Sequence, residues 1–229
     1  MSFEALAERL AQVRATIAAV TSQPRPVTIV AVTKGFGADA VRAALDAGLV
    51  DIGENRVQEA LQKQEELGAG ARGSEIRWHL IGHLQRNKVR AVAGRFVLVH
   101  SLDSLELATE LDRRSATAPP PQRVLLQVNV AREPQKSGCA PEAAPALARD
   151  IAALGNLRLE GLMTLAPFTD DLDVQRQTFR GLRILRDRIQ EEEGLWLETL
   201  SMGMSGDYAT AVAEGATVIR LGTALFGPR

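Results

Sequence analysis

Segments typical of buried β-strands alternate with helical segments along the whole chain of 229 residues. Eight runs are apolar and rich in β-branched residues, which predicts strands buried on both faces. The runs are VTIVAV at 27–32, LVDIG at 49–53, IRWHLIG at 76–82, FVLVH at 96–100, RVLLQVNV at 123–130, LRLEGLMTL at 157–165, LETLSM at 197–202 and TVIRLG at 217–222. Apolar residues three and four apart predict helices at 38–47, 55–67, 103–115, 142–154, 172–193 and 207–214. Asp103 and Pro141 are typical of helix starts.

This alternation predicts an α/β protein with parallel strands, because short connections through one helix join neighbouring parallel strands. Eight such units favour a single (β/α)8 TIM barrel that takes up residues 1–229 as one domain. An extra helix at 2–20 is expected to fill the place of the helix missing after the eighth strand. The proline-rich ATAPPPQ at 116–122 is interpreted as a loop at the bottom of the barrel rather than a domain linker.

Charge and cysteine content exclude several classes of protein. The net charge is −1, so there is no basic excess for nucleic acid or for an acidic membrane surface. The single cysteine, Cys139, excludes an internal disulfide and a cysteine-based zinc cluster, and it suits a reducing cytosol. The N-terminal segment carries Glu4, Glu8 and Arg9, unlike a signal peptide, and no run of 18 apolar residues occurs. A cytoplasmic location is expected.

The stretch TIVAVTKGFG at 28–37 places Lys34 directly after the first strand, as if at a buried position. GFGADA matches the dinucleotide-binding pattern GxGxxA, with Asp51 and Glu54 downstream. A dinucleotide site has no use for a lysine before the first glycine, and eight units suit a barrel better than an open sheet. A core lysine held by an ion pair is a further alternative, although lysine is seldom fully buried without a partner.

Active sites of such barrels lie at the C-terminal ends of the strands, and phosphate groups commonly bind to the loops after strands seven and eight. The seventh strand here ends in Ser201, Gly203 and Ser205, and the eighth in Gly222 and Thr223. Hydroxyl groups and open backbone N–H groups suit a phosphate dianion, and the helix from about 207 is expected to add its N-terminal end.

A lysine amine and a phosphate cup on opposite walls of the barrel mouth suggest a ligand that carries both an aldehyde and a phosphate. Pyridoxal 5′-phosphate (PLP) fits, with Lys34 forming a covalent Schiff base. A Schiff-base aldolase acting on a sugar phosphate is also compatible with these residues. Arg220 favours PLP, because it can face the pyridine nitrogen as a permanent donor. A ring kept neutral in this way is a poorer electron sink.

Several motifs together resemble the YggS/PROSC family of PLP homeostasis proteins. The motifs are AVTKG, IGENRVQEA, WHLIGHLQRNK, LLQVNVAREPQKSG, GLMTLAP, LSMGMSGD and VIRLGTALFG, which extend from about 27 to 227. The family is similar in fold to the N-terminal barrel of alanine racemases, fold-type III among PLP proteins. The resemblance implies that PLP is held and released in the cell.

The resemblance also implies roles for single residues. It assigns Lys34 to the Schiff base, Arg220 to the pyridine nitrogen and Asn55 to the ring side of the cofactor. Phosphate contacts are implied for Ser201, Ser205, Gly222 and Thr223. Met163, at the end of the sixth strand, and Gly203 complete the predicted cofactor site.

Other polar residues have two interpretations each. His79 and His83 have the spacing of a helical metal pair, but they flank a strand end, which favours a structural role and no metal. Lys136 is either a surface residue or a second, transient aldehyde acceptor. The basic residues Arg86, Lys88, Arg90 and Arg95 are expected on the exposed face of a helix. The resemblance favours an undefined role for the segment Gln85, Asn87 and Lys88.

A racemase needs a second acid/base group on the face of the cofactor opposite the lysine. The only tyrosine, Tyr208, is predicted on the wrong side, and the sequence ends at Arg229 without a second domain. We therefore expect a monomeric PLP carrier, without strong catalytic activity, that supplies apo-enzymes. The alternative is a slow amino-acid racemase or lyase with Lys34 as its only base.

Overall fold

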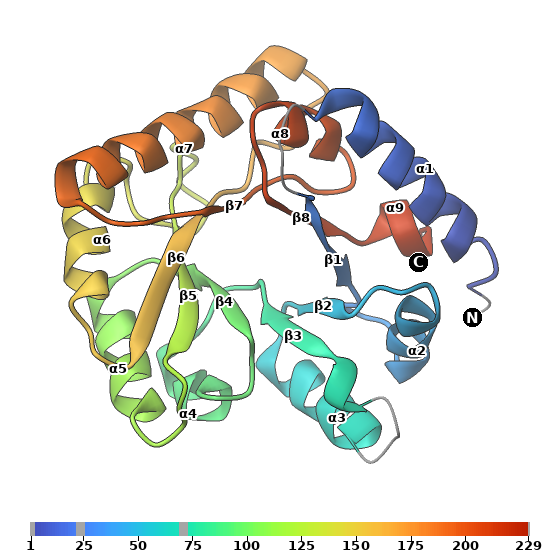
Figure 1. The fold of residues 1–229 in the computed structure, drawn as a ribbon, viewed down its shortest axis with the longest axis horizontal. Coiled ribbons are helices and arrows are strands. Elements are labelled where there is room, and N and C mark those ends of the chain that lie inside the picture. The colour runs from blue at the N-terminus through green and yellow to red at the C-terminus, as the bar shows by residue number, and fades with distance from the viewer. Residues whose placement is uncertain (1–2, 22–25, 69–72, 229) are drawn as a thin grey trace.

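The chain forms a closed barrel of eight parallel strands in a computed structural model (Figure 1). The structure describes residues 3–21, 26–68 and 73–228. Each strand pairs with the next one in sequence, and β8 pairs with β1. The strands are β1 (Thr28–Val32), β2 (Asp51–Glu54), β3 (Arg77–Leu80), β4 (Leu98–Leu102), β5 (Gln122–Gln127), β6 (Leu157–Met163), β7 (Thr199–Ser201) and β8 (Val218–Leu221). The predicted (β/α)8 barrel is confirmed.

Helices surround the strands as an outer ring (Figure 1). They are α1 (Leu6–Val20), α2 (Ala38–Asp46), α3 (Val57–Gly68), α4 (Val89–Val92), α5 (Leu105–Ser115), α6 (Ala144–Ala152), α7 (Leu172–Glu193), α8 (Tyr208–Ala213) and α9 (Thr223–Phe226), with 3-10 turns η1 (Gly73–Glu75) and η2 (Arg86–Lys88). The extra N-terminal helix α1 buries Leu6, Leu10 and Val13 and packs against α8 and α9. The eighth strand therefore does have a helix of its own, the short α9, and α1 completes the ring beside it.

Three predicted helix boundaries are wrong. Ser104, not Asp103, caps α5, because its Oγ accepts a hydrogen bond from the Leu107 N–H at 3.4 Å. Helix α6 begins at Ala144 rather than near Pro141. The basic segment forms only η2 and the single turn α4, so Arg95 lies beyond the helix, although it is exposed as expected. Side-chain capping and short turns are local details that apolar periodicity does not record.

The main hydrophobic core lies between the strands and the helices, as in other barrels of this type. Inside the barrel, Leu98, Leu125 and Met163 form a small separate apolar cluster. Branched apolar residues usually fill such interiors, but here buried histidine, serine and arginine side chains contribute as well. None of the helices in the described part of the chain is both long and apolar enough to cross a membrane.

One glycine is required by the closing of the sheet. Gly161 on β6 pairs with Thr199 on β7, and a Cβ atom at position 161 would lie only 1.9 Å from the Thr199 carbonyl oxygen. Any larger residue would separate the two strands. This close approach sets the position of β7, which carries one of the two predicted phosphate loops.

Candidate functional site at the barrel mouth

Lys34 lies in the loop directly after β1, and its side chain is exposed. The expectation of a buried amine, and the alternative of an ion-paired core lysine, are therefore wrong. The strand ends at Val32, and Gly35, with φ of 75°, turns the chain at the barrel mouth. A hollow of about 280 Å³ is lined by Lys34, Gly35, Asn55, Arg56 and Glu59. The amine is thus available to a ligand from solvent.

A buried group of charges holds the loop that carries Lys34. Lys63 Nζ contacts Glu54 Oε1 at 2.6 Å and Glu59 Oε1 at 2.9 Å, and it donates to the Thr33 carbonyl at 2.8 Å. The Thr33 hydroxyl donates to Glu54 Oε1 at 2.5 Å, and the Gly35 N–H donates to Glu59 Oε1 at 2.6 Å. The residues on both sides of Lys34 are therefore fixed by hydrogen bonds, while its own side chain is exposed.

The two carboxyl groups respond differently to this environment. Burial raises the pKa of Glu54, although hydrogen bonds from Lys63 and Thr33 oppose the shift. Partial burial of Glu59 acts in the same direction, but hydrogen bonds from Lys63 and the Gly35 N–H outweigh it and lower the pKa of Glu59. Lys63 is the cation that both carboxylates share.

The sequence was not interpreted as placing Lys63 near the site, although its spacing on α3 carries a signal for burial. Helix α3 buries Val57, Ala60, Lys63 and Leu67, which are three or four residues apart. A lysine within such an apolar stripe is seldom buried without a charged partner. Its place on the stripe could have identified it as a buried ion-pair residue.

The loop after β7 and the loop after β8 are joined by hydrogen bonds to the Ser205 side chain. Ser205 Oγ accepts hydrogen bonds from the backbone N–H groups of Gly222 at 3.3 Å and Ala224 at 3.1 Å. Thr223 lies between these two residues and is exposed. Two N–H groups that converge on one oxygen can bind an anion, because a phosphate oxygen can take the place of the hydroxyl.

Two details of this phosphate cup differ from the prediction. Helix α8 spans only six residues, and the Asp207 carboxylate already accepts the Met204 N–H before it, so we assign no ligand to its N-terminus. Gly203 has φ of 94°, and a Cβ atom there would lie 2.6 Å from the Ala211 Cβ, so it shapes the turn between β7 and α8.

The cup and Lys34 lie on neighbouring strands rather than on opposite walls. Strand β8 pairs with β1, with Val30 opposite Arg220 and Ala31 opposite Leu221. Lys34 and Thr223 follow these two paired strands, so they emerge side by side at the mouth. The expected opposite placement is wrong because closure of the barrel joins its first and last strands.

Arg220 lies in the barrel interior beneath this mouth, with a relative exposure of 4%. Its Nη1 donates to Ser201 Oγ at 2.6 Å, and its Nη2 donates to the Thr164 carbonyl at 2.9 Å. Burial lowers the pKa of Arg220 to about 10, although the charge of Asp207 opposes the shift. The Ser201 hydroxyl is therefore directed to Arg220, whereas Ser205, Gly222 and Thr223 gather above.

The histidines are arranged differently from the spacing considered in the sequence. His79 is buried and contacts His100 and Asp51, whereas His83 is exposed, with its Nδ1 3.7 Å from Asp103 Oδ2. The alternation of side chains along β3 and β4 could have indicated that His79 and His100 both face inward. Their mutual contact is a tertiary feature.

The remaining candidate residues fall into two groups. A second hollow of about 440 Å³ is lined by Asn55, Arg56, Val57, Gln58, Gly82, His83, Gln85 and Lys88. It shares Asn55 and Arg56 with the hollow beside Lys34, so Gln85 and Lys88 lie next to the candidate site, while Asn87 is exposed outside the lining. Met163 is only 1% exposed and packs against Leu98 and Leu125 inside the barrel.

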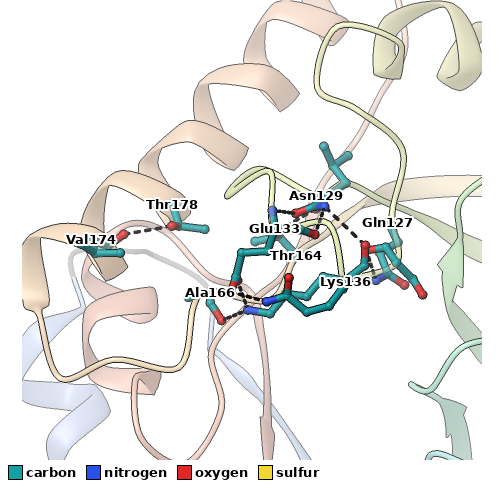
Figure 2. A network of polar contacts seen from close by, with 11 residues as sticks. Gln127, Asn129, Glu133, Lys136, Thr164, Ala166, Val174 and Thr178 are labelled. Atoms are coloured by element: carbon teal, nitrogen blue, oxygen red, sulfur yellow. Dashed lines mark hydrogen bonds and ion pairs between the residues drawn. The ribbon is translucent and has the colours of Figure 1, made fainter.

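Lys136 belongs to a polar network at the ends of β5 and β6 (Figure 2). Its Nζ donates to the Ala166 carbonyl at 2.6 Å and pairs with the Glu133 carboxylate. Asn129 Nδ2 donates to the carbonyls of Glu133 at 2.8 Å and Lys136 at 3.3 Å, which fixes the loop. The Lys136 amine is thus engaged by two partners, and its side chain is 21% exposed.

The chain is similar to known proteins over almost its whole length. The family model described as alanine racemase, N-terminal domain, matches residues 2–229. A Pseudomonas aeruginosa protein named pyridoxal phosphate homeostasis protein is 46% identical over 226 residues, which cover 99% of this chain and 95% of the relative. An Escherichia coli K12 protein of the same name is 39% identical over 235 residues, covering 98% of this chain and 97% of that protein. The solved structure of PipY from Synechococcus elongatus with PLP bound is 39% identical, with a TM-score of 0.86, and covers 97% of this chain and 100% of that one.

Proposed function

Since this chain belongs to the family of pyridoxal phosphate homeostasis proteins, we propose that it binds PLP at the barrel mouth and serves in the homeostasis of this cofactor. The observation that carries the proposal is the arrangement of three groups on or after the neighbouring strands β7, β8 and β1. These are the exposed amine of Lys34, the two N–H groups that converge on Ser205 and the guanidinium of Arg220 beneath them. They suit the aldehyde, the phosphate and the ring nitrogen of one ligand.

In this proposal, different residues bind the aldehyde, the phosphate and the ring of PLP. Lys34 holds the aldehyde end covalently and reversibly, while the backbone N–H groups of Gly222 and Ala224 and the hydroxyls of Ser205 and Thr223 donate to the phosphate. Arg220 donates to the ring nitrogen. Asn55 borders the hollow beside Lys34 on the ring side. The bound group supplies an aldehyde that exchanges among amines, and the protein controls which amine holds it.

Replacing Ser205 or Thr223 with alanine is expected to weaken PLP binding about ten- to a hundredfold, because each change removes a hydrogen bond to a charged acceptor worth roughly 1.5–3 kcal/mol. Affinity for unphosphorylated pyridoxal should barely change. Titration followed by absorbance measures both affinities. Thr16→Ala, on the exposed surface of α1, is the matched control. An equal loss for both ligands would show that the two residues act through the fold.

We propose that the protein is a carrier rather than an efficient enzyme. Arg220 is a permanent donor, so it disfavours protonation of the ring nitrogen and leaves a carbanion at Cα of a bound amino acid poorly stabilised. Tyr208 packs against the hydrophobic core at the start of α8, which keeps it from serving as a mobile acid/base group. The second candidate, slow racemase or lyase activity with Lys34 as base, is favoured by the shared alanine racemase N-terminal domain.

Deuterium exchange into the Cα position of alanine separates the two candidates. The wild-type protein loaded with PLP is expected to exchange very slowly in an NMR time course. Arg220→Glu should exchange faster, because a carboxylate permits ring protonation, and it should also bind PLP more weakly beside Asp207. Lys34→Ala provides the baseline. Rapid exchange by the wild-type protein would overturn the carrier proposal and support the racemase.

The carrier proposal also includes an oligomeric state, a location in the cell and recipients of the cofactor. We propose that the protein works as a monomer in the cytoplasm and passes PLP to apo-enzymes that depend on it. The single, half-buried Cys139 supports a reducing compartment. The exposed position of Lys34 supports release to a partner. Light scattering that gave twice the chain mass would contradict the monomer.

A further inference from the structure

A continuous chain of buried side chains crosses the barrel interior from its floor to Arg220. Asp51, the first residue of β2, contacts His79 Nε2 through Oδ1 at 2.8 Å. His79 Nδ1 lies 2.9 Å from His100 Nε2, and His100 Nδ1 lies 2.8 Å from Ser201 Oγ. Ser201 Oγ then contacts Arg220 Nη1 at 2.6 Å. Five strands each contribute one residue, and none of these contacts involves a surface side chain.

The two ends of the chain have fixed hydrogen-bonding roles. Arg220 can only donate. Asp51 Oδ1 is an acceptor, because Arg77 Nε also approaches it at 3.2 Å. Between them, burial lowers the pKa of His79, although the Asp51 carboxylate opposes the shift. Burial lowers the pKa of His100 well below its ordinary value, and the neighbouring His79 and the charge of Arg220 act in the same direction. Both imidazoles are therefore neutral at neutral pH, with one N–H each.

Only one arrangement of protons then satisfies every contact. His79 donates from Nε2 to Asp51, so its Nδ1 is an acceptor. His100 donates from Nε2 to that nitrogen, so its own Nδ1 is an acceptor. The Ser201 hydroxyl consequently donates to His100 and offers a lone pair to Arg220. Each group donates toward Asp51, and no N–H or O–H faces another.

This order determines what Ser201 can do. Its hydroxyl proton is engaged by His100, so it does not donate to a phosphate, and its oxygen holds Arg220 Nη1. The Thr164 carbonyl holds Nη2 of the same guanidinium at 2.9 Å. If Ser201 were turned, its O–H would face the Arg220 N–H, and the guanidinium would lose one of these two contacts.

We propose that His79 and His100 are positioning residues that hold Ser201 as a hydrogen-bond acceptor and thereby orient Arg220 toward the ring nitrogen of PLP. The inference deepens the proposed function and rests on it for the identity of the ligand. The order of protons, in contrast, is a property of the protein alone. Neither histidine touches the cofactor; each acts through Ser201.

Histidine side-chain NMR of the cofactor-free protein tests the order of protons. The chain has three histidines, and His83→Gln identifies the exposed one. In a long-range ¹H–¹⁵N spectrum at neutral pH, His79 and His100 are both expected as neutral Nε2–H tautomers. An Nδ1–H tautomer or an imidazolium at either residue would overturn the proposal. The measurement requires no cofactor, and its only variant, His83→Gln, changes a histidine outside the buried chain.

A second measurement tests the effect on the ligand. With ¹⁵N-enriched PLP bound, the wild-type pyridine nitrogen should show the shift of a hydrogen-bonded, unprotonated nitrogen. His100→Leu should move this shift toward that of an unbonded ring and weaken binding about tenfold, the effect of about one hydrogen bond. His100→Asn should keep the wild-type shift, because its Oδ1 lies near the position of Nδ1 and can accept from Ser201.

The outcomes separate this inference from the proposed function. An unchanged shift in His100→Leu, or equal shifts in the Leu and Asn variants, would contradict the positioning role, with circular dichroism as the check on folding. Failure of the wild-type protein to bind PLP would contradict the proposed function instead, while the tautomer result would still decide the order of protons.

Discussion

Borohydride reduction of the PLP-loaded protein is expected to leave the mass of the cofactor on the peptide that contains Lys34. The Lys34 amine condenses with the aldehyde to form a C=N bond with loss of one water, and hydride reduces this bond to a stable amine. Lys34 is exposed in the hollow beside Asn55, next to the phosphate cup on the neighbouring strand. Trypsin does not cut at the modified residue, so the label should lie on a peptide that continues to Arg42. Mass spectrometry locates it.

Two variants make this experiment decisive. Lys34→Ala should lose the label and the associated visible absorbance almost completely, because Lys34 is the lysine that lines the hollow beside Asn55. Lys136→Ala should keep both, since the Lys136 amine is engaged by Glu133 and the Ala166 carbonyl. A label found chiefly on Lys136 in the wild-type protein would contradict the assignment of Lys34 and would support the second-acceptor interpretation of Lys136.

Replacing Lys63 with methionine is expected to lower the free energy of unfolding by about 3–5 kcal/mol at neutral pH, because breaking a buried ion pair leaves an uncompensated charge. Glu54 is fully buried, and its Oε2 has no hydrogen-bond partner, so it depends on Lys63 and Thr33 at Oε1. Urea unfolding measures the loss. Arg42→Met, which breaks an exposed pair with Glu66, should cost only about 0–1 kcal/mol.

The loss of unfolding free energy caused by Lys63→Met should become smaller as the pH falls. The folded-state pKa of Glu54 is already above its ordinary value of 4.5, and removal of Lys63 should raise it further. A raised carboxyl pKa favours the folded state at low pH and destabilises it as the pH rises through the folded pKa. Glu59 acts in the same direction: its pKa is lowered in part by Lys63, and that stabilisation of the wild type is lost as the pH falls. The difference between wild type and variant should therefore be smaller near about pH 5 than near about pH 7.

A double variant provides the internal control. Lys63→Met combined with Glu54→Gln removes both charges, and paired neutral residues of similar volume are often tolerated in place of a buried ion pair. It should recover most of the stability lost by Lys63→Met and remove most of the pH dependence. A double variant as unstable as the single one would show that packing of the Lys63 side chain, rather than its charge, supports the loop beside Lys34.

The sequence determined the barrel and the parts of the mouth that come from single strand ends. Strand and helix periodicities are local, so the repeated alternation could be counted without knowledge of any contact. Lys34 after the first strand, and Ser205, Gly222 and Thr223 after the last two, were predicted as site residues because barrel chemistry gathers at those ends. The cap at Ser104 was not predicted, because it depends on a single side chain. The start of α6 at Ala144 was not predicted either, because the turn before it leaves no mark in the apolar periodicity.

Only the tertiary structure decided which of these groups meet. Closure placed β1 beside β8, so that Lys34 and the phosphate cup became neighbours although they are far apart in sequence. It also joined His79, His100 and Ser201, from β3, β4 and β7, in one buried chain beneath Arg220. The alternation of side chains along a strand indicates whether a given side chain points into the barrel. It does not indicate at what height in the barrel the side chain lies or which residue it faces. Those depend on the register between strands, which is set when all eight close together.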